Sequence, residues 1–212
     1  MSDSAGLSSI EAYDVLREAV GEPTASIAKK EMPMLDKHAR HFLSLSPVLF
    51  ISTVGVDGRA DISPRGDPAG FVKVIDDRTI LIPERPGNRR ADTMSNIVEN
   101  PGHSVALIFL LPGVEETLRA SGRARIVDDP AALEDMAVRG KVPQLGILVE
   151  VDEVFFHCAK ALKRARLWDP DARIERREFP TLAQITKDQR EHDTPLEEIE
   201  ERIRESYETR LY

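Results

Sequence analysis

Residues 47–65 read PVLFISTVGVDGRADISPR, and this stretch decides the class of fold. Residues 48–54 are rich in β-branched and aromatic side chains, and a glycine-containing turn sequence at residues 56–59 separates them from residues 60–65. Two such runs joined by a turn of this kind predict a β-hairpin. The polar residues of the second run then lie on an alternating strand rather than in a loop.

Further strands follow this hairpin along the chain. Residues 70–75 and 79–82 repeat the hairpin pattern, and SVALIFLL at residues 104–111 is typical of a buried strand. Residues 117–127 alternate between apolar and polar side chains, and residues 147–156 form the last expected strand. The sequence therefore predicts a mainly β protein with flanking helices (α+β), built as an antiparallel barrel of six or seven strands.

Three parts are expected along the chain: an N-terminal helical extension over residues 1–46, the barrel over 47–168, and an acidic helical tail over 169–212. A capping sequence at residues 194–197 predicts a helix in the tail, with a narrow apolar stripe on one side. Other helices are expected at residues 8–20 and 35–45, between Gly87 and Asn100, and at residues 130–138.

The composition excludes several classes of protein. The 212 residues carry a net charge of -8, which disfavours nucleic-acid binding because phosphate backbones require clustered positive charge. The single cysteine, Cys158, cannot form an internal disulfide or a multi-cysteine metal site. No apolar run approaches the roughly 18 residues of a membrane span, and the N-terminus lacks signal-peptide features. We therefore expect a cytoplasmic protein without a membrane partner, whose redox chemistry would need a cofactor.

The sharpest local feature is Gly-Asn-Arg-Arg at residues 87–90, where the helix after the fourth strand is expected to begin. Asn88 is a favourable N-cap, whereas Arg89 and Arg90 would face the positive end of the helix dipole. That placement costs about 0.3–1 kcal/mol per arginine unless an anion binds there. The pattern favours a phosphate site, and two solvent-exposed arginines are the alternative.

A second polar feature lies in the quoted hairpin. Asp61, Ser63 and Arg65 share one face of the second strand, because side chains alternate along a strand. Three hydrogen-bonding groups on a half-buried face are suited to a flat polar ligand. A solvated edge strand is the alternative.

Two later segments also carry polar and basic side chains. One face of strand 117–127 presents a threonine and several arginines, which point at solvent, a partner subunit or an anionic ligand. The segment from residue 157 ends in the only tryptophan and fits either a cover over a flat anionic cofactor or a salt-bridged loop. No metal-ligand cluster or nucleophile elbow is apparent, so no metal site or catalytic residue is assigned. The residues of interest here are Thr117, Arg119, Lys160, Arg164 and Trp168.

Four segments together resemble the pyridoxamine 5'-phosphate oxidase-like FMN-binding split-barrel family. They are ADISPRGDPAG from residue 60, LIPERPGNRRADTMSNIVENPGHSVALIFLLPG from residue 81, ETLRASGRARI from residue 116 and VFFHCAKALKRARLW from residue 154. The resemblance implies a six-stranded antiparallel split barrel and a homodimer with two FMN molecules at its interface. It implies that Arg89 and Arg90 hold the FMN phosphate. The other implied flavin-binding residues are Ser63, Arg65 and Asn88 from one subunit, with Thr117, Arg119, Lys160, Arg164 and Trp168 from the other.

These features favour an FMN-dependent oxidoreductase that passes electrons between a reduced nicotinamide, NADH or NADPH, and a small molecule. Arg90 stands where vitamin B6 oxidases usually have a lysine, and a further segment follows Trp168, so their catalytic residues are not carried over. Three alternatives stay open: a non-catalytic flavin store or sensor, a barrel that uses heme or a deazaflavin, and a structural dimer whose arginines form salt bridges. Heme would take an axial ligand from His103, His157 or Cys158.

Overall fold

The computed structural model describes residues 9–190 and 193–212, and the chain divides into two units, Met1–Glu31 and Met32–Tyr212. In the described part of the first unit, α1 spans Tyr13–Val20 and α2 spans Ala25–Ala28. Neither helix contains a buried residue, so no apolar core forms there. The second helix was not expected from the sequence.

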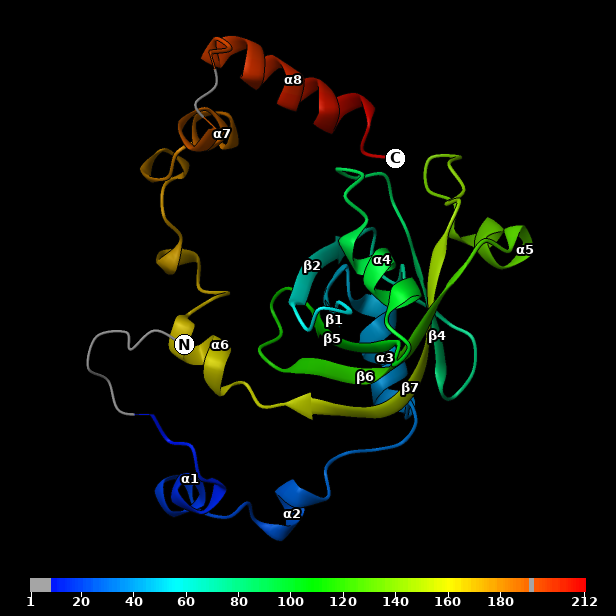
Figure 1. The fold of residues 1–212 in the computed structure, drawn as a ribbon, viewed down its shortest axis with the longest axis vertical. Coiled ribbons are helices and arrows are strands. Elements are labelled where there is room, and N and C mark those ends of the chain that lie inside the picture. Colours follow the sequence, from blue (N-terminus) through cyan, green and yellow to red (C-terminus); the bar gives the residue numbers. More distant parts are fainter. Residues whose placement is uncertain (1–8, 191–192) are drawn as a thin grey trace. The chain divides into compact units, whose positions relative to one another are not determined.

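The second unit is built on one antiparallel sheet in the order β2-β1-β5-β6-β7-β4-β3 (Figure 1). The hairpin at its start is present as predicted, and residues 117–127 form a strand over the predicted range. The fold is therefore the expected mainly antiparallel β structure with flanking helices. The strands are β1 (Val48–Val54), β2 (Ala60–Gly66), β3 (Lys73–Val74), β4 (Thr79–Pro83), β5 (Ser104–Leu110), β6 (Thr117–Val127) and β7 (Gly146–His157).

The sheet has seven strands rather than the six of the implied split barrel, because the short β3 adds an edge beside β4. β3 covers only two residues of the stretch 70–75 that the pattern predicted. Gly70 is not part of this strand, since its backbone adopts a φ of 80° and its N–H donates to the carbonyl of Ser46 at 3.2 Å.

Helix α3 closes one side of the core. It begins after Asp36, whose carboxylate accepts a hydrogen bond from the backbone N–H of Ala39 at 2.8 Å, as an N-cap should. Its buried residues Ala39, Phe42 and Leu43 belong to one hydrophobic cluster with inner side chains of β1, β5 and β7. The helices of this unit are α3 (Lys37–Leu45), α4 (Asp92–Glu99), α5 (Pro130–Leu133), α6 (Lys160–Ala165), α7 (Leu182–Arg190) and α8 (Leu196–Thr209).

The tail forms a small helical layer of its own. Helix α8 packs against α7, and each contributes one buried apolar residue, Ile199 and Ala183. Ile199 is the centre of the apolar stripe predicted for α8, while α6 and α7 were not expected. Among the described residues, no helix is both long and apolar enough to cross a membrane.

The register of the first hairpin decides which way its polar residues face. Leu49 pairs with Arg65, Ile51 with Ser63 and Thr53 with Asp61. Paired residues share a face of the sheet, and the three β1 residues are buried, so the polar face of β2 continues the inner face of the sheet. The edge strand β2 thus exposes hydrogen-bonding groups at the margin of the core.

Candidate functional site

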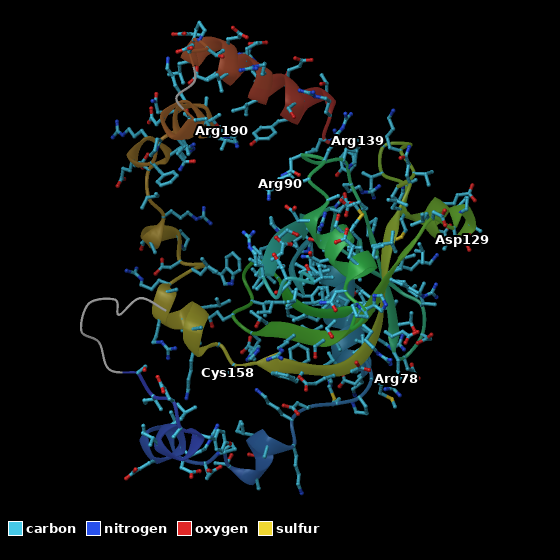
Figure 2. All side chains as sticks on the ribbon, in the orientation of Figure 1. Arg78, Arg90, Asp129, Arg139, Cys158 and Arg190 are labelled. Carbon is cyan, nitrogen blue, oxygen red and sulfur yellow. The ribbon has the colours of Figure 1, made fainter. Side chains whose placement is uncertain are left out.

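A cavity of about 730 Å³ lies where β2, the loop before α4 and the loop 141–145 meet. Figure 2 shows Arg90 in that loop, beside the N-terminal end of α4. Two motifs recognised separately in the sequence are therefore brought together in one place. The predicted residues that line the cavity are Asp61, Ser63, Arg65, Asn88, Arg89 and Arg90.

Thr93, in the first turn of α4, ties β2 to the helix. Its hydroxyl donates to Asp61 Oδ2 at 3.1 Å and therefore accepts the hydrogen bond from the Ser63 hydroxyl, at 3.0 Å. Thr93 is buried and also lines the cavity. This chain of hydrogen bonds fixes the orientation of two of the predicted site residues.

Arg65 is held by an acidic residue at the end of β4. Its Nη1 donates to both carboxylate oxygens of Glu84, at 2.9 and 2.8 Å. The two side chains are only 18% and 17% exposed, so the pair is well shielded from water. The Nε of Arg65 is buried and has no hydrogen-bond partner among the described residues. An unpaired buried donor costs about 1–3 kcal/mol, so a ligand acceptor in the cavity would be favoured there.

The helix after the loop begins later than predicted. Its first residue is Asp92 and its N-cap is Ala91, with a φ of 58°, so Arg89 and Arg90 precede the helix instead of forming its first turn. Asn88 is not the cap, because its Oδ1 accepts from the backbone N–H of Arg90 at 3.0 Å. Arg90 Nε donates to Asp92 at 2.7 Å, which raises the pKa of the guanidinium. Asp92 therefore supplies the negative charge that the helix dipole favours.

Comparison with known proteins decides the family. The sequence model described as pyridoxamine 5'-phosphate oxidase matches residues 35–158, more than half of the chain. The chain belongs to the pyridoxamine 5'-phosphate oxidase family. No curated protein matches it significantly.

Solved structures with a similar fold share little sequence with this family member. HupZ of Group A Streptococcus is 20% identical, with 58% of this chain and 94% of that chain covered and a TM-score of 0.48. A putative pyridoxamine 5'-phosphate oxidase from Lactobacillus delbrueckii is 18% identical, with 58% and 95% covered and a TM-score of 0.45. An FMN-binding protein from Syntrophomonas wolfei is 12% identical, with 56% and 81% covered and a TM-score of 0.41.

The second group of predicted residues in this pyridoxamine 5'-phosphate oxidase family member lies outside the lining of the cavity. Thr117 is buried opposite His157, at the start of β6. Arg119 lies over the ring of Phe155 at 5.2 Å, and Trp168 Nε1 donates to the carbonyl of Val114 at 2.8 Å. The remaining two residues of the group, Lys160 and Arg164, are exposed on α6.

None of the three residues named as axial ligands for heme lines the cavity. His103 Nδ1 lies 2.6 Å from the carbonyl oxygen of Ile97 at the end of α4, and Cys158 is exposed after β7. His157 packs edge-on against Phe155, with ring centroids 4.9 Å apart. Within residues 9–190 and 193–212, no group of three His, Cys, Asp or Glu side chains is placed to hold a metal ion.

Sequence reasoning missed a second ion pair beside the cavity. Arg85 Nε donates to Asp67 Oδ2 at 2.6 Å, and the Tyr212 hydroxyl donates to Asp67 Oδ1 at 2.9 Å. The hydrogen bond to Asp67, with partial burial, raises the pKa of Tyr212. Asp67 lies on the same alternating face as Asp61 and Arg65, so the sequence pattern could have identified it as a site residue. Tyr212 lies 145 residues further on, and no sequence pattern pointed to it.

Proposed function

We propose that this chain binds FMN in the cavity beside β2 and passes electrons through it to or from a small molecule. The observation that carries the proposal is the meeting of a polar strand face and an arginine pair in one cavity of about 730 Å³. That volume falls within the range of about 300–1,000 Å³ found for small-molecule sites. The motifs that resemble FMN-binding members of the family supply these same residues.

The arginine loop would hold the phosphate of the cofactor. Arg89 and Arg90 are exposed at the cavity, and Arg89 forms no ion pair in the part of the chain that the structure describes. Positive side chains just before the N-terminus of an eight-residue helix, α4, suit a dianionic phosphate. Arg90 would then share its charge between Asp92 and the phosphate.

The polar face of β2 would hold the flavin ring. The buried, unpartnered Nε of Arg65 is a donor suited to a ring oxygen or nitrogen, and Glu84 keeps the guanidinium in place. Thr93 orients the hydroxyl of Ser63 in the same way. When bound, FMN would supply the hydride and electron transfer, and Arg65 would stabilise negative charge near the ring.

We further propose that the FMN site is completed by a second copy of the chain. The group around Arg119 and Trp168 lies outside the cavity of its own chain, so it would reach FMN from a partner subunit. The outer face of the β2–β1–β5 part of the sheet carries exposed apolar side chains: Ile62 and Ile108 are 68% and 41% exposed, on strands that flank Phe50. An exposed apolar sheet face of this kind suits burial in a homodimer.

The expected electron donor is NADH or NADPH, with a small organic molecule as the acceptor. A non-catalytic flavin store or sensor is the second candidate. The observation that favours it is the side chain of Tyr212, which lines the cavity and occupies part of its wall. Stopped-flow oxidation of NADH by the FMN-loaded protein separates the two, because a store or sensor gives no turnover with any acceptor.

The proposal is tested by titrating the flavin-free, full-length protein with FMN and with riboflavin, which lacks the phosphate. R89A/R90A should weaken FMN binding about ten-fold or more, because two charge-assisted phosphate contacts are lost, and should leave riboflavin binding unchanged.

The matched control is R59A/R78A, which removes two exposed arginines that do not line the cavity. It should bind FMN as tightly as the wild type. Failure of the wild type to bind FMN, or an equal loss in the control, would overturn the proposal.

A further inference from the structure

Tyr212 makes three contacts that together define a small subsite at the edge of the cavity. Its hydroxyl donates to Asp67 Oδ1 at 2.9 Å. Its ring centroid lies 5.5 Å from the Arg85 guanidinium carbon and 5.4 Å from that of Arg139. Figure 2 shows Arg139 beside the end of the tail. The subsite therefore contacts both the hydroxyl group and the aromatic face of the tyrosine ring.

The charged residues of this subsite lie outside the tail, after β2, after β4 and between α5 and β7. With Tyr212 in place, the Asp67 side chain is 0% exposed and pairs with Arg85 at 2.6 Å. Arg85 Nη2 also donates to the carbonyl of Met136 at 2.6 Å. Asp67 and Arg85 are thus held by each other and by the body of the protein, and the hydrogen bond to Asp67 Oδ1 comes from the tail.

Tyr212 stands between the carboxylate and the cavity. Tyr212 lines the cavity, whereas the fully buried Asp67 does not. If the tyrosine ring left, Asp67 Oδ1 would face the cavity without its hydrogen bond. A buried carboxylate that loses a donor is destabilised, so another donor of the same shape would be bound in its place.

We propose that Asp67, Arg85 and Arg139 form a binding subsite for a neutral hydroxylated aromatic ring, and that Tyr212 is its removable internal occupant. The carboxylate accepts from the ring hydroxyl, and the guanidinium groups favour an electron-rich ring through cation–π attraction. A phenolate is rejected because Asp67 would repel it. The inference rests on the proposed function for its role, since the ring would lie beside FMN, but its binding can be measured without FMN.

Competition with Tyr212 sets the expected size of the effect. A ligand can bind only to the fraction of molecules in which the tail is displaced. Its apparent Kd therefore equals its intrinsic Kd divided by that fraction. If the tail occupies the subsite nine-tenths of the time, removing the ring tightens binding about ten-fold.

The probe is p-cresol, which has the structure of a tyrosine side chain, titrated into the flavin-free full-length protein and followed by NMR. Y212A should bind p-cresol about ten-fold more tightly than the wild type. The control Y207A removes an exposed tyrosine of α8 and should leave binding unchanged. Toluene, which has the ring without the hydroxyl, should gain little from Y212A. Equal gains for toluene, or no gain for p-cresol, would overturn the proposal.

A second variant and a second state of the protein complete the test. Arg139 is exposed, so Y212A/R139A should fold normally and lose part of the gained affinity. In the FMN-loaded protein, p-cresol should still bind to Y212A. Displacement of FMN by p-cresol would overturn the proposal, because the subsite would then be part of the flavin site. If FMN binds to no form of the protein while Y212A still gains p-cresol, the proposed function fails and this inference stands.

Discussion

At the scale of single residues, the site depends on a buried threonine. Thr93 is 2% exposed, yet its hydroxyl has two partners, Asp61 and Ser63. A buried polar group is tolerated when its hydrogen bonds are made, and removing it leaves its partners unsatisfied. Thr93 therefore serves both the stability of the helix–strand contact and the geometry of the cavity wall.

Replacing this hydroxyl should destabilise the protein. T93V keeps the shape of the side chain but leaves Asp61 and Ser63 without their shared partner, so we expect the free energy of unfolding in urea to fall by about 1–3 kcal/mol. T93S restores the hydroxyl and should recover most of that loss. If both variants lose the same amount, the methyl group rather than the network stabilises this position.

At the scale of elements, β6 and β7 form the longest strand pair, and their register shifts between Ser121 and Gly122. A Cβ on Gly122 would lie 1.9 Å from the carbonyl oxygen of Glu150, which is backbone and cannot move aside. The bulge thus requires a residue without a side chain. It shifts the register of β6, the strand that carries Thr117 and Arg119.

G122A should therefore force β6 and β7 apart. Overpacking of this kind costs about 1–3 kcal/mol or more, which we expect as a lower melting temperature in calorimetry. G87A is the matched control, because a Cβ there meets nothing within 4 Å. An unchanged melting temperature for G122A would show that the bulge relaxes without cost.

The elements also show what local pattern can and cannot predict. The alternation of residues 117–127 predicted β6 correctly, because one side of the strand is buried and the other is not. The predicted start of α4 was wrong, because Asn88 accepts a hydrogen bond from the backbone N–H of Arg90 in a turn that precedes the helix. Helix α6 was missed because it has six residues and no buried side chain, so it has no apolar periodicity.

At the scale of the whole molecule, the apolar outer face of the sheet should decide the state of assembly. Glutamates at Ile62 and Ile108 would place charges on a face that we expect to be buried between subunits. I62E/I108E should sediment as a monomer and bind FMN about ten-fold or more weakly, because one subunit's contacts are lost.

The control for this prediction places the same charges elsewhere. I174E/L182E changes two exposed apolar residues that lie outside the strands of the sheet, and should remain dimeric with FMN bound. A dimeric I62E/I108E that retains FMN would show that the interface lies on another surface.

The site as a whole could be predicted only in part. Asp61, Ser63 and Arg65 were placed on one face by strand alternation, and the structure puts that face in the cavity with Arg89 and Arg90. Their partners come from distant segments. Glu84 follows β4, and its pairing with Arg65 depends on how the sheet curves, which local pattern does not contain.

The order of the sheet also sets the order in which it can be assembled. β4 precedes β5 and β6 in the chain, but its neighbour is β7, with Thr79 paired to Glu150. The β3–β4 hairpin therefore has no place in the sheet until residues 146–157 have been synthesised and have paired with β6. Loop closure over such separations slows folding. During synthesis, the edge of the apolar strand β4 that pairs with β7 therefore stays unpaired until β7 has been made.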